Sequence, residues 1–278
     1  MFGNSFDTAL SIIAYTGRIP SSQVGSGIHS DLSPSGSFPK TWRVVNGHRV
    51  LYKAAYDEGL GLEPVSEYLA SQVAAAMGLL HVAYDLDVWQ ELLCSTCVLM
   101  NDAESSFVPF AYMLDRDEKD GMNLERALAF FDGLGEEAGQ RFRSMLVFDA
   151  VIMNPDRHMG NYSVFRDNRT GRVLGFALVF DNNLALLPQY GTESLSEELL
   201  RERFAATPGA FGPTAYQQAC AALGPQQREQ LERLHEFAFD DAALVHVGRQ
   251  ADGFAFSEQR LLALGNAVRE NAATLLRG

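Results

Sequence analysis

Lysine is scarce in this sequence, and clusters of basic residues are absent from it. Of the 22 lysine and arginine residues among 278, only Lys40, Lys53 and Lys119 are lysines, and 35 acidic residues give a net charge of −13. Proteins that bind nucleic acid or anionic membranes tightly use clustered basic side chains to contact phosphates. We therefore expect neither nucleic acid nor a membrane as a direct partner.

Long apolar runs are also missing. A helix that spans a bilayer needs roughly 20 predominantly apolar residues, and the longest runs here, such as Ala9–Tyr15, are much shorter. No basic stretch precedes Ala9–Tyr15, so a secretory signal peptide is not indicated. Apolar residues make up 47% of the chain and charged residues 21%, which is typical of a globular protein. We expect a cytoplasmic protein.

Cysteine is rare, with three residues at positions 94, 97 and 220. The spacing of Cys94 and Cys97 is found in redox and zinc sites, but no second ligand pair follows that would complete a zinc site. The pair lies in an apolar run, Leu92–Met100, which favours a strand. We therefore interpret both as buried, unreactive thiols.

The first part of the chain has the pattern of strands. Trp42–Lys53 contains Asn46-Gly47, a strong signal for a two-residue hairpin turn between strand-forming residues. Further strands are expected near His81–Val88 and Glu91–Met100, and another over Phe107–Leu114.

A helix is expected between these strands. Pro64 lies near its start and Gly78 is suited to its end. Apolar residues recur between them at helical spacing, namely Val65, Leu69, Val73 and Met77.

The second part of the chain is predicted to be mainly helical. Apolar stripes indicate helices over Leu124–Leu134 and Glu137–Met153, and Pro155 is expected to stop the second one. Tyr162–Phe165 and Val173–Phe180 are predicted to form paired strands. Amphipathic helices then fill most of the chain from Ser194 to Leu276.

The most informative stretch is Asn154-Pro-Asp-Arg-His-Met-Gly-Asn161, followed by Phe180-Asp-Asn-Asn183. Asp156 and Asn161 are five residues apart across a loop, and the predicted strand pair would return Asp181 beside them. Two carboxylates and an amide oxygen form a set of hard ligands suited to Mg²⁺. The alternative is an Asx-rich turn that caps the preceding helix, which the position of Asp181 disfavours.

This order of residues also occurs in kinases, in which a catalytic Asp precedes a metal-binding Asn by five residues and a second Asp follows a hairpin. Here Asp-Arg-His replaces the usual His-Arg-Asp, as in atypical kinases. Over roughly residues 30 to 190 the chain resembles the HipA-like serine/threonine kinases, and phosphatidylinositol kinases more distantly. The resemblance implies a two-lobed α+β kinase-like fold, with a small antiparallel-sheet lobe over 1–112 and a mainly helical lobe over 113–278.

The resemblance assigns roles to particular residues. Asp156 would be the catalytic base, and Asn161 and Asp181 would bind Mg²⁺. Kinases hold the α- and β-phosphates of ATP with a strand lysine that pairs with a helix glutamate. Lys53 ends a predicted strand and matches that lysine, and Glu67 in the following helix matches its partner. Glu63, one turn earlier, is the competing candidate.

The phosphate-covering loop is expected within the Ser-, Gly- and Pro-rich segment Ser21–Pro39, for which a flexible linker is the alternative. Gly25-Ser-Gly27 and Ser33–Ser37 are both candidates. The resemblance favours Ser35, Gly36 and Ser37, because HipA-like kinases carry a serine- and glycine-rich loop shortly before the strand lysine. Since such a loop can itself be phosphorylated in the family, Ser33, Ser35 and Ser37 are candidate autophosphorylation sites.

Several polar residues around the loop have open roles. Arg157 could contact phosphate or clamp a neighbouring carboxylate, and the sequence does not decide between these. His158 is interpreted as a structural hydrogen-bonding residue rather than an acid or base. Asn154 and Asp149 are expected to brace the loop.

The resemblance implies transfer of the γ-phosphoryl group of ATP, with Mg²⁺, to a Ser or Thr hydroxyl of a protein. The adenine would lie near Ala111–Leu114, and a regulatory protein partner would be in keeping with the family. A lipid or small-molecule acceptor and a catalytically silent pseudokinase are the alternatives. HipA-like toxins carry an additional amino-terminal subdomain, and we expect this chain to begin almost directly at the small lobe.

Overall fold

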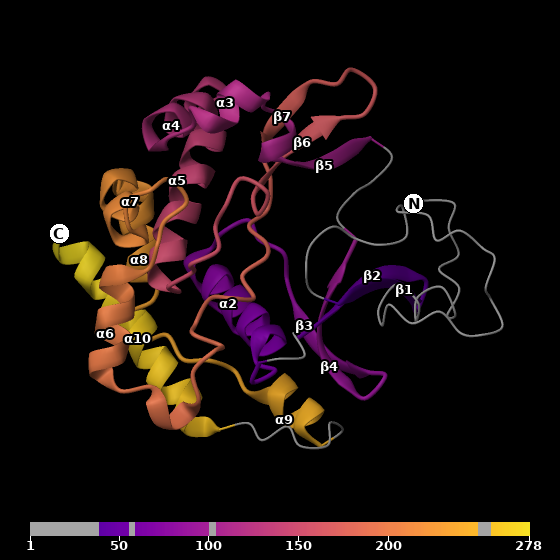
Figure 1. Cartoon of the computed structure of the whole chain (residues 1–278), viewed down its shortest axis with the longest axis vertical. Coiled ribbons are helices and arrows are strands. Elements are labelled where there is room, and N and C mark those ends of the chain that lie inside the picture. Colours follow the sequence, from indigo (N-terminus) through magenta and orange to yellow (C-terminus); the bar gives the residue numbers. More distant parts are fainter. Residues whose placement is uncertain (1–38, 56–58, 100–103, 250–256) are drawn as a thin grey trace.

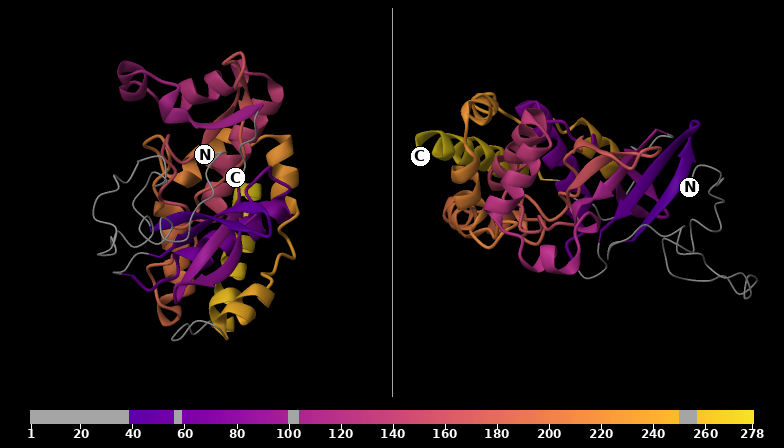
Figure 2. Two further views of the ribbon diagram at one scale, coloured as in Figure 1. Left: turned by 90° about the vertical axis from the view of Figure 1, so that its right-hand side faces the viewer. Right: turned by 90° about the horizontal axis from the view of Figure 1, so that it is seen from above.

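Two antiparallel sheets and a body of helices make up the computed structural model of the chain (Figure 1). The structure describes residues 39–55, 59–99, 104–249 and 257–278. The first sheet has the strand order β1-β2-β4-β3 and the second has the order β5-β6-β7. The right-hand view of Figure 2 shows the four-stranded sheet and the carboxyl end of the chain at opposite ends of the molecule. The predicted α+β class is confirmed.

The hairpin of β1 (Lys40–Val45) and β2 (His48–Ala54) forms around the predicted turn. Asn46 has φ 50° and Gly47 has φ 81°, and positive φ at both central residues is the mark of a type I′ turn. The twist of this turn matches the twist of the two strands, so the loop needs only two residues. The resulting register places Lys40 opposite Lys53.

A second hairpin completes this sheet. It consists of β3 (Asp85–Trp89) and β4 (Leu92–Val98), and β4 also pairs with β2. Cys94 and Cys97 are buried free thiols in β4, as predicted. Burial, followed by the charge of Glu67, raises the pKa of Cys97 to about 12, which keeps this thiol protonated and unreactive.

Helix α2 (Glu63–Met77) lies between the four-stranded sheet and most of the helical body (Figure 1). Pro64 stands in its first turn, and Gly78 ends it with φ 73°. The predicted apolar stripe faces inward, and its four residues, Val65, Leu69, Val73 and Met77, are at most 1% exposed. The predicted helix is thus confirmed together with its buried face.

The second sheet joins distant parts of the chain. Strand β5 (Ser105–Pro109) pairs with β6 (Ser163–Asp167), which pairs with β7 (Val173–Phe176). The strand predicted over Phe107–Leu114 ends early, because the buried Phe110 ring turns inward and a 3-10 helix, η3 (Phe110–Tyr112), follows. Strand β5 belongs to the predicted small lobe (1–112) and β6 to the predicted helical lobe (113–278), so this sheet contains strands from both. The division of the chain into lobes at residue 112 stays a prediction.

The helical body follows the predicted pattern. Its first two large helices correspond to the two predicted apolar stripes, and the second one ends just before Pro155. None of the helices in the described ranges is long and apolar enough to cross a bilayer. The helices are α3 (Arg116–Asp120), α4 (Leu124–Gly133), α5 (Glu136–Val151), α6 (Glu197–Ala206), α7 (Ala215–Ala222), α8 (Pro225–Glu232), α9 (Ala242–Gly248) and α10 (Glu258–Arg277), with a short 3-10 helix, η4 (Thr192–Ser194).

Two apolar cores of unequal size hold these elements. The large core joins α2 to the helical body and the second sheet, and it contains a cluster of aromatic rings around Phe131 and Phe142. The small core lies in the four-stranded sheet and consists of Tyr52, Ala54, Trp89 and Cys94. Most of the buried apolar surface, and hence most of the hydrophobic stabilisation, belongs to the large core.

The Gly47→Ala variant should lose about 1–2 kcal/mol of stability, because an L-residue is strained at positive φ. A Cβ at Gly47 would meet no atom within 4 Å, so backbone strain alone is tested. Gly133→Ala is the matched control, since Gly133 also has open space around it but lies in α4 without a positive φ. Urea unfolding should show a loss only for Gly47→Ala, and equal losses would contradict the role of the turn.

Candidate active site

Three of the predicted site residues form one cluster of charges, in which Lys53 and Glu67 are buried and Asp181 is half-buried. Lys53 Nζ donates to Glu67 Oε2 at 2.9 Å and also to Oδ1 of Asp181. The three residues come from β2, from α2 and from the segment that follows β7. Glu67, rather than the competing Glu63, therefore is the helix carboxylate that pairs with the strand lysine.

Glu67 is fully buried, and both of its oxygens have partners. Oε2 accepts from Lys53, and Oε1 accepts from the backbone N–H of Asn182 at 2.8 Å. A buried carboxylate is stable only when it is paired and hydrogen-bonded. The neighbouring Ser66 hydroxyl donates to the carbonyl of Ala185, so two adjacent residues of α2 hold the segment after Asp181.

Opposite charges keep the lysine and the aspartate ionised. Burial lowers the pKa of Lys53, but the charges of Glu67 and Asp181 more than offset this and raise it above its ordinary value. For Asp181, burial raises the pKa, while the charge of Lys53 and its hydrogen bond outweigh burial and lower it. Both groups are therefore charged at neutral pH.

Lys40 is a member of this cluster that the sequence analysis missed. It lies opposite Lys53 in the β1–β2 register. Burial, and then the charge of Lys53, lower the pKa of Lys40, while the charges of Asp181 and Glu67 raise it. Like charges opposite one another on neighbouring strands are destabilising. The two carboxylates offset that repulsion, and the site thus gathers two of the three lysines of the chain.

The loop that carries the other candidate residues follows α5. The side-chain amide of Asn161 donates to the carbonyl oxygen of Asp156 at 3.0 Å and to its Oδ2 at 3.2 Å. The loop thus holds Asp156 and Asn161 side by side, as their spacing predicted. Because the amide nitrogen of Asn161 is directed at Asp156, its oxygen is the atom able to bind a cation.

Arg157 joins this loop to the Asp181 segment. Its guanidinium makes a two-pronged bond to Asp149, with Nε to Oδ2 and Nη2 to Oδ1 both at 2.9 Å. It also donates to the carbonyls of Asn161 and Phe180 and to the side-chain oxygen of Asn182. The Arg157 side chain is 1% exposed. Of the two roles left open by the sequence, the structure thus supports the carboxylate clamp.

The remaining loop residues act within the loop. Asn154 donates from Nδ2 to Asp149 at 3.1 Å and accepts from the backbone N–H of Asp156. His158 accepts from the backbone N–H of Gly160 through Nδ1 at 3.0 Å. These contacts agree with the bracing role expected for Asn154 and with the structural hydrogen-bonding role expected for His158.

Tyr84 is a second residue that the sequence analysis missed. Its hydroxyl accepts from the backbone N–H of Asp181 at 3.4 Å. Asp181 has φ 56°, a left-handed conformation that Asp adopts more readily than most residues. Burial, followed by the charge of Glu67, raises the pKa of Tyr84 well above its ordinary value, so the hydroxyl stays neutral.

The donor set suits Mg²⁺. No group of three or more His, Cys, Asp and Glu side chains within the described ranges is arranged to hold a metal ion by itself. Mg²⁺ is commonly bound through one or two carboxylates together with substrate phosphates and waters. Lys53 contacts Oδ1 of Asp181, so Oδ2 and the side-chain oxygen of Asn161 are the atoms that would bind the ion. Ser35, Gly36 and Ser37 lie outside the described residues, and their assignment stays a prediction.

Comparisons with known proteins identify the fold. No protein-family model and no curated protein sequence matches the chain. The solved structure of the Helicobacter pylori proinflammatory kinase CtkA is similar, with a TM-score of 0.62 and 19% identity over 86% of this chain and 91% of that one. HipA, from the Shewanella oneidensis MR-1 toxin–antitoxin complex with HipB and operator DNA, has a TM-score of 0.50 and 13% identity over 98% of this chain and 71% of its own.

These likenesses show that the chain has a kinase-like α+β fold. The resemblance to HipA-like kinases, first suggested by the Asp156–Asn161 loop, is thereby confirmed at the level of the fold.

The Arg157→Met variant should lose about 3–5 kcal/mol of stability, because it leaves the buried Asp149 carboxylate without a counter-charge. Arg143→Met is the matched control. Arg143 also forms a two-pronged bond to an aspartate, Asp132, but that pair is exposed. The control should change stability by less than about 1 kcal/mol. Similar melting temperatures for the two variants would contradict the importance of the buried pair.

Proposed function

We propose that this protein is an ATP- and Mg²⁺-dependent phosphotransferase of the HipA-like type, which transfers the γ-phosphoryl group to a Ser or Thr hydroxyl of a protein. The observation that carries the proposal is the charge cluster of Lys53, Glu67 and Asp181, joined through Arg157 to the loop of Asp156 and Asn161. A phosphotransferase needs this combination of fixed cations and hard oxygen ligands.

Lys53 would bind the α- and β-phosphates of ATP. Its ammonium is held by Glu67 and Asp181, so its position is fixed before the nucleotide arrives. Lys40, on the adjacent strand, adds a second positive charge next to the same phosphates. Preorganised charges of this kind stabilise a transition state without a cost of reorganisation.

Asp181 and Asn161 would hold Mg²⁺, which neutralises the negative charge that develops between the β- and γ-phosphates. Oδ2 of Asp181 would be the oxygen available to the ion, because Oδ1 accepts from Lys53. Arg157 holds the carbonyls of Asn161 and Phe180, and therefore fixes both ligands relative to each other. Tyr84 fixes the backbone of Asp181 from the other side.

Asp156 would orient the acceptor hydroxyl and take its proton. As the oxygen of that hydroxyl bonds to the γ-phosphorus, the bond from phosphorus to the β,γ-bridging oxygen breaks, and ADP leaves with the electron pair. The Asn161 amide donates to the Asp156 carboxylate and holds it in place. Asp156 is half-buried, so it is accessible to a substrate.

Replacing Asp156 by Ala should reduce phosphoryl transfer from γ-labelled ATP by about 10²–10⁴-fold, the usual contribution of a positioned general base. Asp117→Ala is the control, since Asp117 is an exposed carboxylate in α3. Labelling of the protein itself and of added protein, lipid and small-molecule acceptors would be measured in parallel. Equal labelling by wild type and Asp156→Ala would remove Asp156 from its assigned role.

Mg-ATP should raise the melting temperature of the wild type, and EDTA should abolish the rise. Lys53→Met should lose most of the rise because the phosphates lose their fixed ammonium, whereas Lys119→Met, at the lysine outside the cluster, should keep it. Binding without transfer to any acceptor would favour a nucleotide-sensing pseudokinase. A Lys53→Met protein that is stabilised as strongly as the wild type would contradict the phosphate site.

A further inference from the structure

The buried face of α10 consists of apolar and small residues except at two positions, Arg260 and Asn271. The two are roughly three helical turns apart, so their side chains project from the same stripe of the helix. Both side chains donate to backbone carbonyls of other elements. Since a polar group is stable in an apolar core only when it is hydrogen-bonded, these two positions mark where α10 holds the backbone of its neighbours.

Arg260 holds the segment of chain that follows β7. Its Nη1 donates to the carbonyl of Tyr190 at 2.7 Å, and its Nη2 donates to the carbonyls of Leu186 and Leu187 at 3.2 and 2.8 Å. Arg260 is 3% exposed, and no carboxylate forms an ion pair with it in the described part of the chain. Burial lowers the pKa of Arg260 to about 10, so the guanidinium is still charged at neutral pH. The three carbonyls therefore compensate a buried positive charge.

The backbone that Arg260 holds is strained. Leu186 has φ 54° and Leu187 has φ 57°, a left-handed conformation that bulky residues rarely adopt. Strained residues persist only where surrounding contacts hold them, and they gather at functional sites. The N–H of Leu186 also donates to the carbonyl of Ile152, directly after α5, at 2.9 Å. The strained pair thus joins the end of α5 to the segment that follows Asp181.

Asn271 holds the neighbouring residue of α5. Its Nδ2 donates at 3.0 Å to the carbonyl of Val151, the last residue of that helix, and Asn271 is 5% exposed. The last carbonyls of a helix have no partner within it, so this bond caps α5 just before the loop of Asp156 and Asn161. Helix α10 is therefore attached to both parts of the chain that carry the proposed metal ligands.

We propose that Arg260 and Asn271 are positioning residues for the proposed phosphoryl transfer, an inference that rests on that function. Arg157 joins the loop to the segment after β7 close to the metal ligands, whereas α10 anchors both parts at their far ends. Without that anchor, Asn161 and Asp181 would lose their fixed separation. The Mg²⁺ ion that they share would then be bound more weakly.

The variants Arg260→Met and Asn271→Leu remove the donors and keep most of the side-chain volume. In each, the Mg²⁺ concentration that gives half-maximal transfer from γ-labelled ATP should rise about tenfold or more, the usual effect of losing a residue that orients a metal ligand. The KM for ATP at saturating Mg²⁺ should change little. Arg260→Lys, which retains the charge and part of the hydrogen bonding, should fall between Arg260→Met and the wild type.

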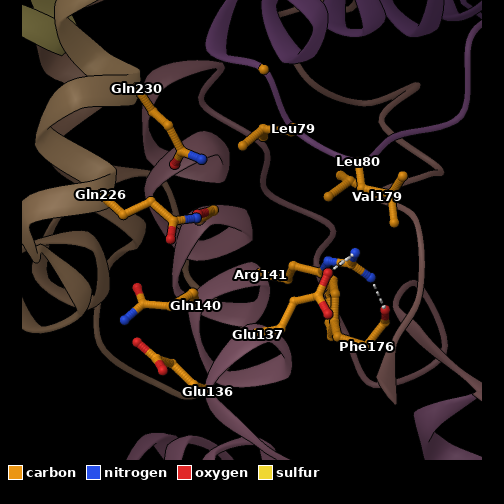
Figure 3. A pocket seen from close by; sticks show the side chains of 12 residues that line it. Leu79, Leu80, Glu136, Glu137, Gln140, Arg141, Phe176, Val179, Gln226 and Gln230 are labelled. Carbon is orange, nitrogen blue, oxygen red and sulfur yellow. Dashed lines mark hydrogen bonds and ion pairs between the residues drawn. The ribbon is translucent and has the colours of Figure 1, made fainter. Parts of the chain in front are cut away.

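Two control variants, Arg269→Met and Gln227→Leu, separate positioning from a general loss of stability. Arg269 lies in the same helix and donates to the carbonyl of Phe237. Gln227 is a fully buried amide of α8 that donates to the middle of α5, at the carbonyl of Gln140, at 3.2 Å. Gln140 lines a cavity between α5 and α8 (Figure 3), and none of the proposed site residues lines that cavity. Neither control should change the Mg²⁺ requirement, whatever its effect on the melting temperature.

Amide hydrogen exchange in the nucleotide-free protein tests the anchor without relying on activity. The amide of Asn182, which donates to Glu67, should exchange about tenfold faster in Arg260→Met than in the wild type, because the segment opens locally. The amide of Asn161, which donates to the carbonyl of His158, should respond in the same way to Asn271→Leu. Neither control variant should speed exchange at these amides.

The outcomes distinguish this inference from the proposed function. If the α10 variants matched the controls in Mg²⁺ requirement, the proposal would be wrong, even where exchange had changed, because the two residues would then have only a structural role. If the wild type transferred no phosphoryl group to any acceptor, the proposed function would fail. Exchange would still decide whether α10 anchors the two segments, and unchanged exchange would overturn that anchor.

Discussion

The buried pair of Arg157 and Asp149 is the interaction on which the site depends. Moving these two charges out of water is costly, and only a complete set of partners makes it favourable. Asp149 fixes the guanidinium from α5, and the remaining N–H groups reach the loop of Asp156 and Asn161 and the segment after β7. One side chain therefore sets the distance between Asn161 and Asp181, the two residues that would share a metal ion.

A second buried charge, Glu67, extends this arrangement to the four-stranded sheet. It connects α2 to Lys53 on one side and to the backbone of Asn182 on the other. Asn182 is also bonded to Arg157, so an unbroken series of polar contacts runs from the sheet to α5. The geometry of the site therefore rests on charge pairs, and the apolar cores supply the stability that maintains them.

Local signals in the sequence predicted most of the elements, and the resemblance to HipA-like kinases suggested most residues of the candidate site. The Asn46-Gly47 turn even fixed the register that pairs Lys40 with Lys53, so Lys40 could have been found by continuing the pairing down the hairpin. The choice of Glu67 over Glu63 came from the resemblance to HipA-like kinases, because the contact that holds Glu67 in place involves the distant backbone N–H of Asn182. Tyr84 was missed for the same reason, since its contact with Asp181 joins residues 97 positions apart.

The unequal division of the apolar cores has a consequence for how the molecule opens. Helix α2 belongs to the large core, whereas β1 and β2 are held by a small one. Units with few buried apolar contacts open first in native-state fluctuations. We therefore expect the outer hairpin to detach as a separate cooperative unit and to take both lysines away from the carboxylates. A polyanion, such as the proposed nucleotide, that bound the hairpin lysines and the rest of the site together would suppress this opening. The affinity for nucleotide and the folding of the hairpin would then be one linked equilibrium.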